Sequence, residues 1–128
     1  MILADSDVLI DFLRGREPAR SRIEIELQHD LATTVVNAFE LLSGARADRH
    51  LEKVELLLDA LRVLPVDREA AAAAAKVRLE LERAGQGIGM ADYLIAGVCL
   101  SRHAVLLTRN RTHFGRVPGL KLGIGDIG

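Results

Sequence analysis

The chain opens with the stretch MILADSDVLIDFLRG, residues 1–15. Its first four residues form a short apolar run that ends at an acid, which is typical of a buried strand. Residues 8–13 then predict a short helix that ends at Gly15. A strand followed at once by a helix is the opening of an α/β unit, and the rest of the chain continues that order.

The same alternation predicts further elements to the end of the chain. We expect strands over residues 31–36, 63–66, 105–107 and 120–122, and helices after Pro18 and over 37–47, 51–61, 67–84 and 90–102, with a short helix or turn around 113–114. Asn37 is the expected N-cap of its helix, with Glu40 at capping-box spacing, and Pro65 favours an edge position for the third strand. This pattern predicts an α/β fold with a parallel four- or five-stranded sheet covered on both faces, in a single domain over residues 1–128.

Composition excludes several functional classes. The chain has 128 residues, 49% hydrophobic and 27% charged, with a net charge of −1, which excludes a disordered chain and a histone-like basic nucleic-acid binder. Aromatic residues make up only 3%, which argues against a base-stacking platform for single strands. A single cysteine excludes an intrachain disulfide. We find no signal peptide and no apolar run of membrane-spanning length, and therefore expect a cytoplasmic protein without membrane association.

Acidic side chains occur beside the expected strands at points far apart in the sequence. Asp5 closes the first strand, Glu40 lies in the first turn after the second, and Asp92 begins the helix that leads into the fourth. Ligands of open parallel sheets bind outside the carboxyl ends of the strands, so we expect these acids to meet at that edge. Each also has a structural alternative, because Asp5 can cap a helix, Glu40 can serve a capping box and Asp92 can favour a helix dipole.

Three carboxylates at one edge favour a cation. Their mutual repulsion would raise at least one pKa unless a positive charge lies among them. Hard oxygen ligands suit Mg²⁺ or Mn²⁺, with water completing the octahedron, whereas the scattered His29, His50, His103 and His113 fit no zinc spacing. We therefore expect Asp5, Asp92 and Glu40 to hold Mg²⁺ or Mn²⁺.

Arginines occur in the segments that adjoin this edge. An acidic metal centre surrounded by arginines fits a polyanionic phosphate substrate, since the acids hold the metal and guanidinium groups grip phosphates. At least half of these arginines have the alternative of being solvated surface side chains. The set comprises Arg14, Arg16, Arg46, Arg109, Arg111 and Arg116.

Four segments resemble, in order and spacing, the motifs of PIN-domain nucleases, particularly the VapC toxins. The match spans nearly the whole chain, and four motifs in order are far more specific than one. The segments are Ile2–Asp11, Asn37–Gly44, Ile88–Ala96 and Thr108–Phe114.

The resemblance implies both a fold and an activity. It implies a three-layer α/β/α sandwich and a Mg²⁺- or Mn²⁺-dependent endoribonuclease that acts as the toxin of a type II toxin–antitoxin pair. Asp5, Glu40 and Asp92 match the acidic triad, and Thr108 matches the Ser/Thr of the fourth motif. Relatives carry a further acid near the positions of Asn110 or His113. This chain has none there, so we expect one well-occupied cation site, with the Asn110 carbonyl oxygen as a neutral helper.

Two other functions remain open at this point. The stretch Leu3–Val8 also resembles haloacid dehalogenase-type phosphatases, in which Asp5 would be the nucleophile and Asp7 the acid/base. The second alternative is a catalytically weak PIN module that binds RNA or an antitoxin without turnover.

Partners follow from the same resemblance. It implies an RNA substrate, a cognate VapB-type antitoxin whose C-terminal segment lies along the toxin, and a homodimer. The leucines between residues 51 and 61 exceed what one small sheet obviously covers, although each is equally well explained as core. We expect the antitoxin groove between the helices at residues 8–13 and 51–61.

Overall fold

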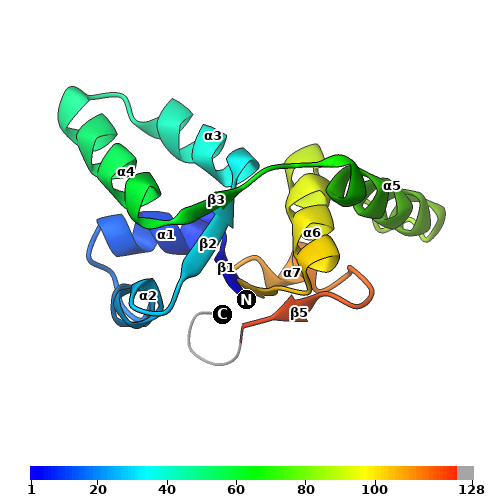
Figure 1. Ribbon diagram of the computed structural model, residues 1–128. Coiled ribbons are helices and arrows are strands. Elements are labelled where there is room, and N and C mark those ends of the chain that lie inside the picture. The colour runs from blue at the N-terminus through cyan, green and yellow to red at the C-terminus, as the bar shows by residue number, and fades with distance from the viewer. Residues whose placement is uncertain (124–128) are drawn as a thin grey trace.

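Short apolar runs assemble into a five-stranded parallel sheet in the computed structural model, which describes residues 1–123 (Figure 1). The strands are β1 (Ile2–Ala4), β2 (Leu31–Thr34), β3 (Arg62–Leu64), β4 (Val105–Leu107) and β5 (Lys121–Leu122). They lie in the order β3-β2-β1-β4-β5, and every neighbouring pair is parallel. The predicted parallel sheet and the edge position of the third strand are confirmed.

Helices cover both faces of this sheet, which confirms the three-layer architecture. Figure 1 shows α1, α2 and α4 on one side of the strands and α5 and α6 on the other. The helices of the described chain are α1 (Ser6–Leu13), α2 (Ala19–Leu27), α3 (Val35–Gly44), α4 (Asp48–Ala60), α5 (Arg68–Arg83), α6 (Met90–Arg102) and α7 (Arg111–Phe114).

Successive residues of the central strands pack into different layers. Leu3 and Leu106 lie in the core beneath α5 and α6, whereas Ala4 and Leu107 lie in the core beneath α1, α2 and α4. All four are fully buried, and burying one such leucine contributes about 2 kcal/mol. The two cores therefore hold β1 in the middle of the sheet. Asp5 follows directly after the carboxyl end of β1.

The start of α3 differs from the sequence-based prediction. The strand ends at Thr34 rather than Val36, and Thr34 is the N-cap, because its side chain accepts from the backbone N–H of Asn37 (3.2 Å). Asn37 sits three residues into this capping box, and its Oδ1 accepts from Thr34 in return. The prediction of Asn37 as N-cap with Glu40 in the box is wrong, and Glu40 is left available for another contact.

Close packing of α5 against α6 explains the alanine run of residues 70–75. Asp67 caps α5 as predicted, by accepting from the backbone N–H of Ala70 at 2.9 Å. A Cβ on Gly97 of α6 would strike the Ala70 carbonyl oxygen and lie 2.8 Å from Ala74 Cβ. The two helices therefore approach so closely that only glycine fits at the crossing.

None of the helices within residues 1–123 has the length and apolar character that a membrane span requires.

Candidate active site

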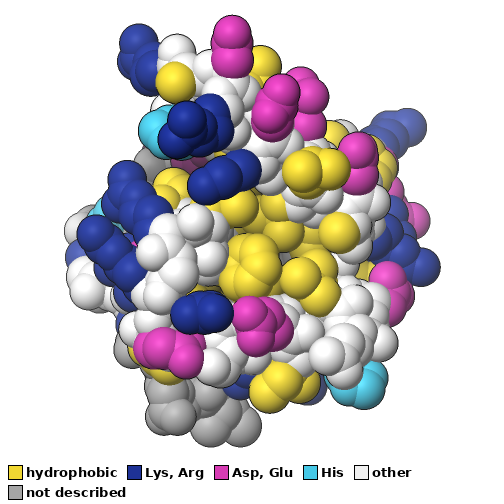
Figure 2. Space-filling view, turned by 90° about the vertical axis from the view of Figure 1, so that its left-hand side faces the viewer, with side chains coloured by type: hydrophobic (Ala, Val, Ile, Leu, Met, Phe, Trp, Pro, Cys, Tyr) yellow, Lys and Arg dark blue, Asp and Glu magenta, His cyan; other side chains and the backbone are white. Residues whose placement is uncertain are grey.

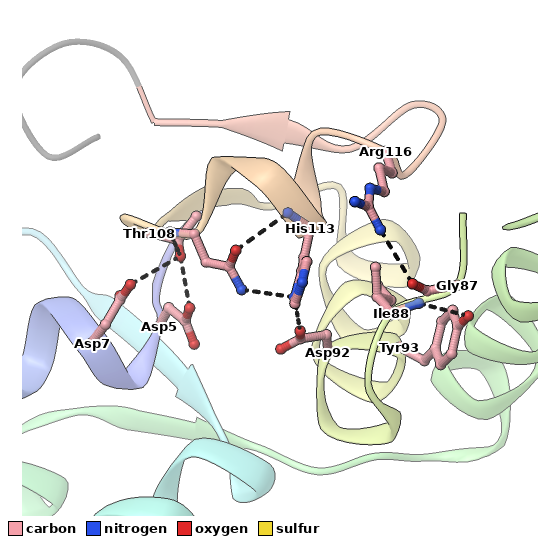
Figure 3. Close-up of polar contacts among 10 residues, drawn as sticks. Asp5, Asp7, Gly87, Ile88, Asp92, Tyr93, Thr108, His113 and Arg116 are labelled. Carbon is pink, nitrogen blue, oxygen red and sulfur yellow. Dashed lines mark hydrogen bonds and ion pairs between the residues drawn. The ribbon is translucent and has the colours of Figure 1, made fainter. Parts of the chain in front are cut away.

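Asp5 is fixed at the carboxyl end of the central strand. It caps α1, since its Oδ1 accepts from the backbone N–H of Ser6 at 2.8 Å. The same oxygen accepts from Asn37 Nδ2 at 3.0 Å. Oδ2 accepts from Thr108 Oγ1 at 2.7 Å (Figure 3). The helix-cap alternative for Asp5 is therefore correct, and the same geometry places its carboxylate next to Thr108, as the motif resemblance implies.

Glu40 joins Asp5 through two intermediate side chains. Ser6 Oγ donates to Glu40 Oε1 at 2.7 Å and accepts from Asn37 Nδ2 at 2.9 Å. Asn37 thus contacts both Asp5 and Ser6. The sequence did not single out Ser6 or this role of Asn37. Their positions beside Asp5 and within the second motif were the only signals available.

Asp7 lies beside the same carboxylate. Its Oδ2 accepts from the backbone N–H of Arg109 at 2.9 Å, while its buried Oδ1 has no hydrogen-bond partner anywhere in residues 1–123. Burial is the main cause that raises the pKa of Asp7. Burial, followed by the charge of Asp7, raises the pKa of Asp5 to about 6, although the hydrogen bond from Thr108 opposes the change.

Asp92 enters from α6 and contacts a different group. It lies in the first turn of that helix, and its Oδ2 is 3.0 Å from His113 Nδ1. Asn110 Nδ2 is 3.2 Å from the same ring nitrogen, and Asn110 N donates to Thr108 Oγ1 at 3.0 Å. Figure 3 shows Asp5 beside Thr108 and Asp92 beside His113, with the two carboxylates on separate elements. The structure thus joins Asp5 directly to Thr108 and places Asp92 in a second group around His113.

The donor set has the chemistry that a hard divalent cation needs. Carboxylate oxygens suit Mg²⁺ or Mn²⁺, and the raised pKa of Asp5 and the unpaired Asp7 Oδ1 mark buried negative charge that a cation would stabilise. No three His, Cys, Asp or Glu side chains of residues 1–123 are already gathered as a metal cage. Mg²⁺ in proteins is commonly bound through one or two carboxylates, with water and substrate phosphates completing its shell, so the residues fit such an ion.

The arginines divide into two groups. Arg109 Nε pairs with Asp11 Oδ2 at 2.8 Å, and Arg111 and Arg116 donate to the carbonyl oxygens of Gly123 and Gly87. These three stabilise the structure around the site. Arg14 instead lines a pocket of about 220 Å³ that Glu40 also lines, and Arg16 and Arg46 are exposed.

This pocket lies between α1, α3 and α4, where the sequence predicts a groove. Figure 2 views the side of the molecule that carries these helices and shows a hydrophobic area with Lys and Arg side chains along one side. The lining residues are Ile10, Leu13, Arg14, Glu40, Leu41, Gly44, Ala45, His50, Lys53 and Val54. An apolar floor with a basic margin therefore lies next to one of the acids of the site.

The chain is similar to known proteins over most of its length. Residues 2–120 match the PIN domain family. Ribonuclease VapC10 of Mycobacterium tuberculosis is 38% identical over 122 residues, which cover 94% of this chain and 91% of the relative. The tRNA(fMet)-specific endonuclease VapC of Salmonella typhimurium is 30% identical over 125 residues and 94% of each chain.

A solved structure supports the same likeness in three dimensions. The chain is similar to one in the crystal structure of DNA-bound VapBC from Salmonella typhimurium, with a TM-score of 0.86 and 29% identity. The match covers 96% of this chain and 98% of that one.

Proposed function

The chain belongs to the PIN-domain family, and on that premise we propose that it is an endoribonuclease that acts as the toxin of a VapBC-type toxin–antitoxin pair. We propose that it cleaves RNA in the cytoplasm, with Mg²⁺ or Mn²⁺ bound by Asp5 and Asp92 directly or through water and with Glu40 as a direct or an outer ligand. The observation that carries this proposal is the PIN-domain match over residues 2–120, together with the buried Asp5 carboxylate that Asn37 and Thr108 fix at the end of β1.

The chain's own residues prepare Asp5 for this role. Asn37 and Thr108 each donate to one oxygen of Asp5, which fixes the plane of the carboxylate. A ligand held in one orientation loses less conformational entropy when it binds an ion. Ser6 holds Glu40 in the same way, and His113 contacts Asp92.

When bound, the cation would polarise the scissile phosphate and promote attack by water. The P–O3′ bond would then break and leave a 5′-phosphate and a 3′-hydroxyl. We propose one cation in the free protein, because Asn110 and His113 stand where a further acid would be needed to balance a second. Arg14, which lines the same pocket as Glu40, is available to bind an RNA phosphate.

Two partner surfaces support the toxin assignment. The pocket between α1, α3 and α4 suits an apolar segment of a VapB-type antitoxin, and Glu40 in its wall would let that segment approach the acids. The exposed apolar side chains of α3, namely Val35, Phe39 and Leu42, suit a homodimer contact, and Phe39 is 69% exposed. On α4, Leu57 is buried in the chain's own core, whereas Leu56 is 70% exposed.

Two alternative functions were open from the sequence, and the PIN-domain assignment argues against the phosphatase. The phosphatase alternative needs Asp7 as an acid/base, whereas Asp7 Oδ2 accepts from the Arg109 backbone and its other oxygen is buried. A PIN module that binds RNA without cleaving it is the remaining alternative.

Incubation of the purified chain with mixed-sequence RNA distinguishes these functions. We expect internal cleavage with Mg²⁺ or Mn²⁺ and none after addition of EDTA. Retention of RNA in a gel-shift assay, with no cleavage under either metal, would favour the binding module. Release of phosphate from a small phosphomonoester would favour the phosphatase.

A further inference from the structure

A continuous line of hydrogen-bonded groups connects Asp5 with Asp92. Thr108 Oγ1 donates to Asp5 Oδ2 and accepts from Asn110 N, and the backbone N–H of His113 donates to Asn110 Oδ1 at 3.2 Å. His113 Nδ1 then lies 3.0 Å from Asp92 Oδ2. Residues 108–113 therefore bridge carboxylates that belong to β1 and α6, and His113 is the last member of the bridge (Figure 3).

The contacts of Asn110 fix how the His113 ring is placed. Because Asn110 Oδ1 accepts from the His113 backbone, Asn110 Nδ2 must be the atom that faces His113 Nδ1, at 3.2 Å. The ring nitrogen thus lies between an amide that can only donate and a carboxylate that, when ionised, can only accept. A bare Nδ1 would satisfy Asn110, but a proton on Nδ1 satisfies Asp92, and we infer this tautomer because hydrogen bonds to an ionised carboxylate are stronger than neutral ones.

His113 is the only side chain of residues 1–123 that lies within hydrogen-bond distance of Asp92. The Asp92 side chain is 22% exposed, so without this contact it would be free to change rotamer. Asp5, by contrast, is fixed by three donors. Three donors thus fix the orientation of Asp5, whereas the His113 ring alone contacts the Asp92 carboxylate among the side chains of residues 1–123.

We propose that His113 is a positioning residue for the metal site: its Nδ1–H holds the Asp92 carboxylate in the orientation in which it binds the cation. The role rests on the proposed metal-dependent function and assigns the ring no contact with the metal. Removing a group that orients a metal ligand typically costs 10- to 100-fold in affinity. The His113 side chain is 42% exposed, so we expect the lower end, about tenfold.

The test is a calorimetric titration of the full 128-residue chain with MnCl₂, comparing the wild type with three variants. His113→Ala removes the donor, His113→Asn restores an N–H close to the position of Nδ1, and His29→Ala alters an exposed histidine of the turn after α2. We expect about tenfold weaker binding for His113→Ala, and binding within about threefold of the wild type for the other two. Thermal unfolding of each metal-free variant checks that the fold is retained.

Pulsed electron paramagnetic resonance of bound Mn²⁺ completes the test. We expect no nitrogen coupling in the wild type, because the ring acts through Asp92. Unchanged or tighter binding by folded His113→Ala, failure of His113→Asn to restore affinity, or a directly coordinated nitrogen would each overturn the positioning role. Absence of Mn²⁺ binding by the wild type would instead contradict the proposed metal-dependent function on which the role rests.

Discussion

Asp5 is a buried helix cap and also a proposed metal ligand. These two roles conflict, because burial disfavours the charged carboxylate that a metal ligand needs. Its oxygens cap α1 and bind Asn37 and Thr108, which holds the carboxylate in place. Burial and the neighbouring Asp7 nevertheless raise its pKa to about 6, so the ionised form destabilises the metal-free fold. A cation bound beside Asp5 would offset this unfavourable buried charge.

Asp5→Asn should stabilise the metal-free protein at neutral pH. A raised pKa means that the folded state binds the proton more tightly than the unfolded state, so the wild type loses stability as pH rises from about 4 to about 6. The variant removes that loss, and we expect a gain of about 1–3 kcal/mol in unfolding free energy at pH 7.5 that shrinks by pH 4.5. Urea unfolding in EDTA measures it.

Asp59→Asn, an exposed change on α4, is the matched control and should differ from the wild type by only a few tenths of a kcal/mol at both pH values. A variant Asp5→Asn that is less stable than the wild type at pH 7.5, or a gain that does not depend on pH, would show that Asp5 is not strained by its charge.

The boundaries of the helices and strands were harder to predict from the sequence than their existence. The sequence predicts α6 over residues 90–102 and β4 over 105–107, and both are confirmed. It fails at Thr34–Asn37, because both Thr and Asn can cap a helix and the β-branched Val35 and Val36 favour a strand. Tertiary contacts decide which residue caps α3, because Asn37 Nδ2 donates to Asp5 and Ser6. Both partners lie far away in the sequence, so no local pattern shows these contacts.

The crossing of α5 and α6 gives a prediction about packing. Gly97→Ala would place a methyl group against the Ala70 carbonyl oxygen and 2.8 Å from Ala74 Cβ, so the helices must separate. We expect a loss of about 1–3 kcal/mol in unfolding free energy, measured by urea denaturation. Gly44→Ala at the end of α3 is the control, because its new methyl group would meet nothing within 4 Å. Equal stability of the two variants would contradict the close approach of α5 and α6 at Gly97.

At the scale of the whole molecule, one face carries the pocket and the adjoining edge of the sheet carries the acids. We predict that Leu13→Ala, in the pocket wall, weakens binding of the VapB-type partner about tenfold. Leu79→Ala on α5 removes a leucine that is 57% exposed outside the pocket and should leave binding unchanged. Calorimetric titration with the antitoxin's C-terminal segment measures both. Equal losses, or none, would place the partner elsewhere.

The overall architecture was predictable because it depends on periodicity and order, which a sequence displays directly. Strand–helix alternation fixes a parallel sheet, and a parallel sheet brings the residues after its strands to one edge. The contact of His113 with Asp92 was not predictable in the same way. It depends on how the His113 ring is oriented beside Asn110, and His113 lies 21 positions from Asp92 along the chain.

Cleavage of RNA by the wild type and by Asp5→Asn, in Mg²⁺ and in EDTA, tests whether Asp5 holds the cation that cleaves RNA. We predict Mg²⁺-dependent cleavage that leaves 5′-phosphate ends, and no cleavage in EDTA. For Asp5→Asn we predict a rate about a thousandfold lower, equivalent to about 4 kcal/mol of transition-state stabilisation. Asp59→Asn should cleave at the wild-type rate. Full activity of folded Asp5→Asn, or cleavage that continues in EDTA, would contradict the claim that Asp5 holds the cation that cleaves RNA.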